Sequence, residues 1–142
     1  MLENDYLMRM IMLFVRFLQQ ALAERHKDPL TAAGDLEKQI ADAVDIDPDL
    51  FFSLTPESMT ILLELGDFDE RLAEFVVRAM AIDKELLTEA GQLQKAELRE
   101  AQLKALIATY HLEISNEDLD RTAIEAFLQD QADESAGDVE GK

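Results

Sequence analysis

The chain has 142 residues, of which 48% are apolar, no cysteine, and a formal net charge of −18. The lack of cysteine excludes disulfides and thiolate metal sites, and the negative charge argues against nucleic-acid and anionic membrane partners. Leu, Ala, Glu, Met and Gln dominate while Gly and Pro are few, which predicts an all-α fold. The length fits one domain with its own core.

The most apolar stretch comes first, at Tyr6–Ala23, where the polar residues are Arg9, Arg16, Gln19 and Gln20. Each arginine would cost about 2.5–3.5 kcal/mol at the centre of a membrane span, and the acidic start is unlike that of a signal peptide. The stretch therefore predicts a helix over residues 5–25, capped by Asn4, that is apolar around most of its circumference. Other helices, a second copy or a partner must cover such a helix.

Proline marks the starts of the next three helices. In Asp28-Pro29, Asp47-Pro48 and Thr55-Pro56 an N-capping side chain precedes a proline, which is favoured at the first helical position. These dipeptides predict a helix over residues 29–44, a short helical turn from residue 48, and a helix over residues 56–65. Gly66 is expected to end the last of these in the left-handed conformation.

Three further helices are predicted, over residues 68–90, 93–112 and 116–131. Asp67 and Ser115 are the expected caps of the first and third, and Gly91 separates the first from the second. Residues 132–142 are too polar to offset their ordering entropy, so a disordered acidic tail is expected there. The predicted organisation is a single domain at residues 1–131, an antiparallel array of about six helices with tetratricopeptide-like hairpins, followed by the tail at residues 132–142.

Chemistry-bearing motifs are scarce. Asp45, Asp47 and Asp49 have the spacing of a calcium loop, but the sequence lacks the glycine and the bidentate glutamate that an EF-hand requires. A capped turn is the favoured interpretation. His26 and His111 belong to no ligand or triad pattern. We therefore expect no catalytic residue, no cofactor and no metal.

The negative charge is concentrated in two blocks. Residues 28–70 carry −11 and residues 115–142 carry −7, whereas residues 1–27 and 71–114 are nearly neutral. The first interpretation of such charge is solubility. The second is that the block at residues 28–70 attracts a basic protein partner.

Two segments resemble known families. Residues 65–70, LGDFDE, followed by a long helix to Asp83, are similar to the second half of a tetratricopeptide repeat. The opening NDYLMRMI and FVRFL, with DIDPDLFFSL at residues 45–54, resembles an uncharacterised bacterial family of small helical proteins over roughly residues 1–90. This resemblance implies a tetratricopeptide-like fold and a cytoplasmic location, and it assigns no catalytic residue.

Three functions stay open at this point. The first is a non-enzymatic interaction or scaffold module that self-associates, with a dimer favoured, through the first helix. Its candidate interaction residues are Tyr6, Met10, Leu13, Phe14, Phe17 and Leu18. The second is an acidic regulator that binds a basic protein through residues 28–70. The third is an enzyme that uses a metal at Asp45, Asp47 and Asp49.

Overall fold

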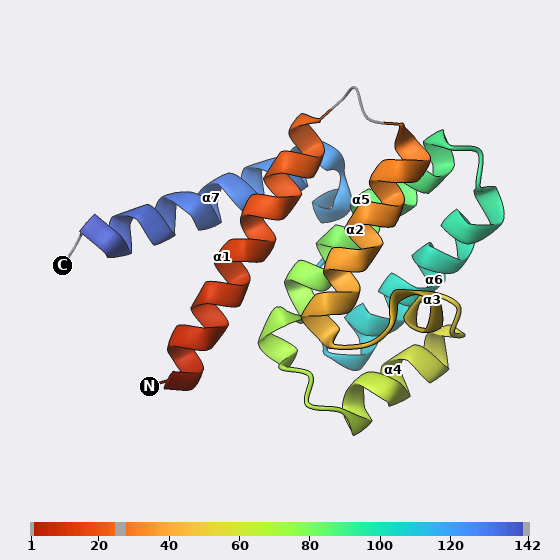
Figure 1. Ribbon diagram of the computed structural model, residues 1–142, viewed down its shortest axis with the longest axis horizontal. Coiled ribbons are helices and arrows are strands. Elements are labelled where there is room, and N and C mark those ends of the chain that lie inside the picture. Colours follow the sequence, from red (N-terminus) through yellow and green to blue (C-terminus); the bar gives the residue numbers. More distant parts are fainter. Residues whose placement is uncertain (1, 25–27, 141–142) are drawn as a thin grey trace.

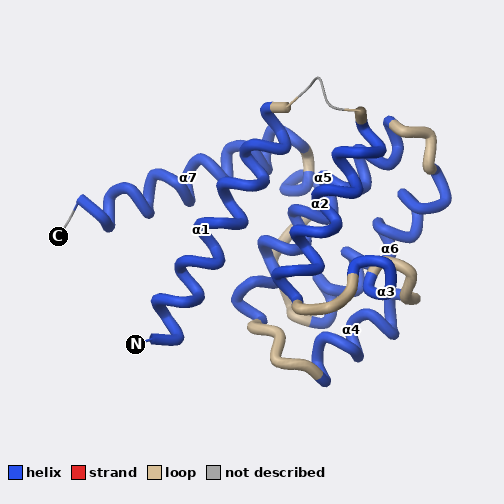
Figure 2. Tube along the Cα trace, in the orientation of Figure 1, coloured by secondary structure: helices blue, strands red, loops and turns tan. Residues whose placement is uncertain are grey.

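The computed structural model describes the backbone of residues 2–24 and 28–140, and the side-chain surroundings of residues 5–24 and 28–134. All regular structure in this part of the chain is helical, so the predicted all-α class is confirmed (Figure 2). The α-helices are α1 (Leu2–Ala23), α2 (Pro29–Val44), α3 (Pro48–Phe51), α4 (Pro56–Leu65), α5 (Ala73–Glu89), α6 (Leu93–Thr109) and α7 (Arg121–Glu140). Two 3₁₀ turns, Glu70–Leu72 and Asn116–Leu119, precede α5 and α7.

The three boundaries that proline predicted are confirmed. At each one the capping side chain accepts a hydrogen bond from a backbone N–H three residues later: Thr31 to Asp28 at 3.2 Å, Leu50 to Asp47 at 3.1 Å, and Ser58 to Thr55 at 3.2 Å. This bond satisfies one of the amides that a helix start leaves without a partner. Asp47 therefore serves as a helix cap.

Two predicted helix starts and one predicted backbone conformation are wrong. The helix α1 begins at Leu2, so Asn4 lies inside it. Gly66 ends α4 as predicted, and its N–H donates to the Leu62 carbonyl at 3.2 Å, but its backbone is extended, with φ −92°, and not left-handed. The helix α5 begins at Ala73 instead of residue 68, because the Asp69 side chain accepts from the Arg71 N–H at 3.0 Å and directs a 3₁₀ turn first.

The C-terminal boundaries also shift. The helix α6 ends at Thr109, and His111 takes a positive φ of 52° just beyond it. The capping pair of Ser115 and Asp118 is present, but it begins the 3₁₀ turn ahead of α7. Residues 132–140, assigned to the tail from the sequence, continue α7 and run out beyond the other helices in Figure 1. Residues 141–142 lie outside the described part.

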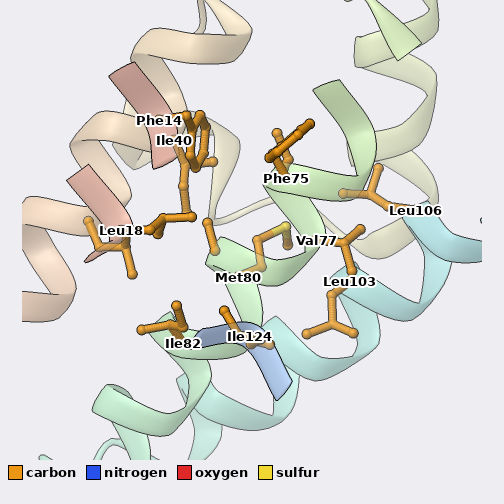
Figure 3. Close-up of a cluster of buried hydrophobic side chains, with 14 of the residues drawn as sticks. Phe14, Leu18, Ile40, Phe75, Val77, Met80, Ile82, Leu103, Leu106 and Ile124 are labelled. Atoms are coloured by element: carbon orange, nitrogen blue, oxygen red, sulfur yellow. The ribbon is translucent and has the colours of Figure 1, made fainter. Parts of the chain in front are cut away.

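The helix α5 is the centre of the arrangement. It packs against α6, with which it forms a hairpin around Gly91, and against α2 (Figure 1). The helix α4 packs on α6, and α1 packs on α7, α2 and α5. Figure 3 shows the resulting core, where Phe14 and Leu18 from α1 approach Ile40 from α2 and Met80 from α5. The neighbours of α1 thus cover one of its faces.

Candidate functional site

Three adjoining hollows follow the seam between α1 and α2. The largest, 770 Å³, lies where the first half of α1 meets the end of α2 and the connection from α4 to α5. Hollows of 250 Å³ and 210 Å³ continue it along the two helices. Met10 and Asp42 line both the first and the second hollow, and Phe17 and Gln39 line both the second and the third. We call the three together the α1–α2 groove.

The α1 wall of this groove is apolar. Tyr6, Met10, Leu13 and Phe17 line it at intervals of four, three and four residues, which places them on one side of the helix. This is the spacing with which a helix contacts another helix along its length. The largest hollow is also lined by apolar side chains from the end of α4 and from the connection to α5, including Leu65, Phe68 and Leu72.

The structure divides the six residues predicted for interaction between two faces of α1. Phe14 and Leu18 belong to the core, with 6% and 0% of their surface exposed (Figure 3). Tyr6 and Leu13 are 62% and 61% exposed. Met10 and Phe17 are half-buried along the groove. The helix therefore has a core face and a separate, uncovered apolar face.

The opposite wall is acidic. Asp42, Asp45, Asp67 and Asp69 line the largest hollow, whereas the smallest is lined by Asp35 together with Lys38. Asp69 is paired with Arg71, whose Nη2 lies 2.8 Å from its Oδ2, and this hydrogen bond lowers the pKa of Asp69. Among the described residues, no hydrogen bond or ion pair engages the carboxylates of Asp42, Asp45 and Asp67.

The end of α2 adds to the negative potential. Asp42 and Asp45 stand at the C-terminal turn of α2, which carries no basic residue. The last carbonyls of a helix present a partial negative charge, so acidic side chains there are unfavourable and a cation is favoured. The groove therefore joins an apolar wall to a region where both the carboxylates and the C-terminal end of α2 would stabilise a positive charge.

A second polar cluster is buried between α2, α5 and α6. The Arg99 guanidinium on α6 donates from Nε to Asp83 Oδ2 on α5 at 2.7 Å and from Nη2 to Glu37 Oε2 on α2 at 3.0 Å. Asp83 is 0% exposed and Arg99 is 2% exposed. The guanidinium also stacks on the Phe52 ring, 4.3 Å from its centroid. A single cation thus holds carboxylates from two helices.

Gln102 extends this cluster to the connection between α3 and α4. Its Nε2 donates to the carbonyls of Phe52 at 3.2 Å and Leu54 at 2.8 Å, while its Oε1 accepts from Arg99 Nη1 at 2.6 Å. None of the residues that hold Arg99 lines the groove or the other hollows described along the chain. Its hydrogen bonds join α2, α5, α6 and the connection between α3 and α4, so the cluster positions helices.

Sequence reasoning missed this cluster because it treated charged residues as exposed. One signal was present. Asp83 falls at core spacing between Met80 and Leu87, and Arg99 falls at core spacing between Ala96 and Leu103. An acid and a base at core positions of successive helices predict a buried pair.

The chain matches no protein-family model, no curated protein and no solved structure. Within the described ranges, none of the helices has both the length and the hydropathy to cross a bilayer. In the same ranges, no three His, Asp or Glu side chains are grouped so that they could hold a metal ion together. The α1–α2 groove, which combines exposed apolar side chains with carboxylates, is the candidate site.

Proposed function

We propose that the chain is a non-enzymatic protein–protein interaction module whose α1–α2 groove receives an apolar, basic helix of a partner protein. The observation that carries the proposal is that the groove combines an exposed apolar wall with the carboxylates of Asp42, Asp45 and Asp67, which no other described residue engages. Laying an amphipathic helix into an apolar groove is a common mode of protein recognition.

The dimensions suit such a helix. From Tyr6 to Gln20, which line opposite ends of the groove, α1 rises about 21 Å, so a partner helix of about 14 residues would follow it. Leucine-like side chains at intervals of three and four residues would meet Met10, Leu13 and Phe17. Lysine or arginine side chains on one edge of the partner would reach Asp42 and Asp45.

A labelled model peptide tests the proposal by fluorescence anisotropy at 0.15 M salt. The probe is a 14-residue helix with leucine at positions i, i+3, i+4 and i+7 and lysine on the remaining face. One control peptide replaces lysine by glutamate, and another scrambles the order so that no apolar face forms. We expect both controls to bind at least about tenfold more weakly, since loss of either contact removes about 1.4 kcal/mol or more.

The chain supplies a matched pair of variants for this measurement. Leu13 in the groove and Leu93 at the start of α6 are 61% and 60% exposed. Leu13→Glu should weaken the lysine peptide about tenfold or more, and Leu93→Glu should leave its affinity unchanged. Equal effects of the two substitutions, or equal affinity for the ordered and scrambled lysine peptides, would contradict the proposal.

Self-association of the chain as a dimer is the second candidate, and a property of α1 favours it. Tyr6 and Leu13 are exposed, and the exposed Arg9 and Arg16 lie along the neighbouring edge of the helix. A second copy's α1 therefore combines apolar and basic side chains as the groove requires. Light scattering over a dilution series tests this candidate: a dimer dissociated by Leu13→Glu but not by Leu93→Glu supports it, and a strict monomer removes it.

The family resemblance supports two further proposals, a tetratricopeptide-like arrangement and a cytoplasmic location. The α5–α6 hairpin is compatible with the first, since tetratricopeptide repeats are built from helical hairpins. A tetratricopeptide repeat over residues 56–89 would pair α4 with α5. Because α4 packs mainly on α6, this pairing stays a prediction.

A further inference from the structure

We infer that Asp83 and Glu37 share one proton, which makes the attachment of α2 to α5 and α6 a proton-dependent latch. The inference is independent of the proposed function, because Glu37, Asp83 and Arg99 do not line the groove and would interact whatever the groove binds. It rests on the number of charges in the buried cluster and on one oxygen that lacks a donor.

The charges in the cluster balance only with an added proton. Arg99 on α6 donates both to Asp83 and to Glu37 on α2. The connection between α3 and α4 contributes two backbone carbonyls, and Gln102 is neutral. On α5 itself the next residue, Lys84, is paired with Glu100 at the half-exposed edge. Two carboxylates thus face one guanidinium, and one proton makes the cluster neutral.

The position of that proton follows from the hydrogen bonds. Asp83 Oδ2 accepts from Arg99, whereas Asp83 Oδ1 is fully buried and has no donor. The Glu37 carboxylate is bound to the same guanidinium and lies close enough to Asp83 to affect its ionisation. Two ionised carboxylates cannot hydrogen-bond to each other, because both only accept. A proton on Asp83 Oδ1 turns this contact into an O–H donated to Glu37 and satisfies the buried oxygen.

The electrostatic environment agrees with this placement. Burial, and then the hydrogen bond with Glu37 and its charge, raise the pKa of Asp83 to about 9 from its ordinary value of 3.8, against the opposing effect of Arg99. Between these pH values the folded chain holds a proton that the unfolded chain has released. The stability from this group is complete below the ordinary pKa and is lost as pH rises through the folded pKa.

Deprotonation would place two anions, one fully buried and one partly buried, on one cation. Glu37 belongs to α2, the helix that also carries Asp35, Gln39 and Asp42 of the groove. Loss of the proton would therefore weaken the attachment of α2, and of the groove residues that it carries, to α5 and α6. The α5–α6 hairpin would stay in place. Rising pH should thus release α2 before the rest of the fold.

The test is the pH dependence of unfolding by urea, from pH 5.5 to pH 9, for the wild type and two isosteric variants. In Asp83→Asn the amide donates to Glu37, and in Glu37→Gln the amide donates to Asp83, so neither variant needs the proton. Across this range the equilibrium constant for unfolding of the wild type should rise by a factor of about ten for each pH unit. The constants of the two variants should lack this additional rise. Glu100→Gln, which removes an edge carboxylate from α6, should keep the wild-type slope.

Two further results decide the inference. The double variant Asp83→Asn/Glu37→Gln leaves Arg99 without a carboxylate, so it should unfold far more readily than the two single variants together imply. In the wild type, the ¹³C signal of the Asp83 carboxyl carbon should report a protonated acid at pH 7. Parallel pH profiles in all chains, or an Asp83 signal that titrates below pH 5, would overturn the shared proton even if a variant fails to fold.

Discussion

Arg99→Met is the substitution that tests the buried cluster most directly. Methionine keeps an unbranched apolar side chain against the Phe52 ring but removes the guanidinium and its bonds to Asp83, Glu37 and Gln102. Removal of one partner from a buried ion pair destabilises by about 3–5 kcal/mol, because the remaining charge is uncompensated. The Glu37 side chain is 22% exposed and gains some hydration, so we expect the lower part of this range.

Arg71→Met is the matched control. Arg71 lies 2.8 Å from Asp69, about as close as Arg99 is to Asp83, but its side chain is 53% exposed. An exposed pair contributes at most about 1 kcal/mol. Urea unfolding followed by circular dichroism at pH 7 measures both variants, and Arg99→Lys, which keeps the charge with a smaller set of donors, should fall between them. Equal losses for Arg99→Met and Arg71→Met would refute the role assigned to burial.

Three further predictions use the same unfolding measurement. Leu36→Ala removes a fully buried side chain of α2 and should lower the unfolding free energy by about 2–5 kcal/mol; a loss under 1 kcal/mol would mean that the site collapses without a cavity. Gly34 lies inside α2 with open space around a new methyl group, so Gly34→Ala should stabilise the fold by about 0.5–1 kcal/mol. Gly91 has a φ of +79°, so Gly91→Ala should destabilise it by about 1 kcal/mol or more. Changes of the same sign in the two unfolding free energies would contradict this pair of predictions. Asp28→Ala removes the α2 cap and should lower stability by about 0.5–2 kcal/mol, and an unchanged midpoint would show that the cap is replaced.

Features set by neighbouring residues could be predicted from the sequence. The starts of α2, α3 and α4 depend on a side chain that caps an amide three residues later and on a proline beside it, so those boundaries follow from local chemistry. The predicted start of α5 at residue 68 was wrong because Asp69 and Arg71 bind each other and stabilise a 3₁₀ turn there. Local rules do not rank two competing local structures.

Features set by distant residues could not be predicted in this way. Glu37 and Arg99 are 62 residues apart, and no periodicity in either helix states that they meet. The same limit applies to the candidate interaction residues. Leu13 and Phe14 are adjacent and both apolar, and only the packing of α2, α5 and α7 around α1 decides that Leu13 faces out and Phe14 faces in.

The two hydrogen bonds from Gln102 have a consequence for the order of folding. The carbonyls of Phe52 and Leu54 stand where the chain leaves α3, and their partner is a side chain 48–50 residues later. Closing so long a loop is slow compared with forming a helix, so the corner between α3 and α4 reaches its final shape only after α6 has docked. Contacts made after the transition state govern the rate of unfolding and leave the rate of folding unchanged. If the two bonds form after the transition state, we expect this amide to slow the unfolding of the corner and to leave its rate of folding unchanged.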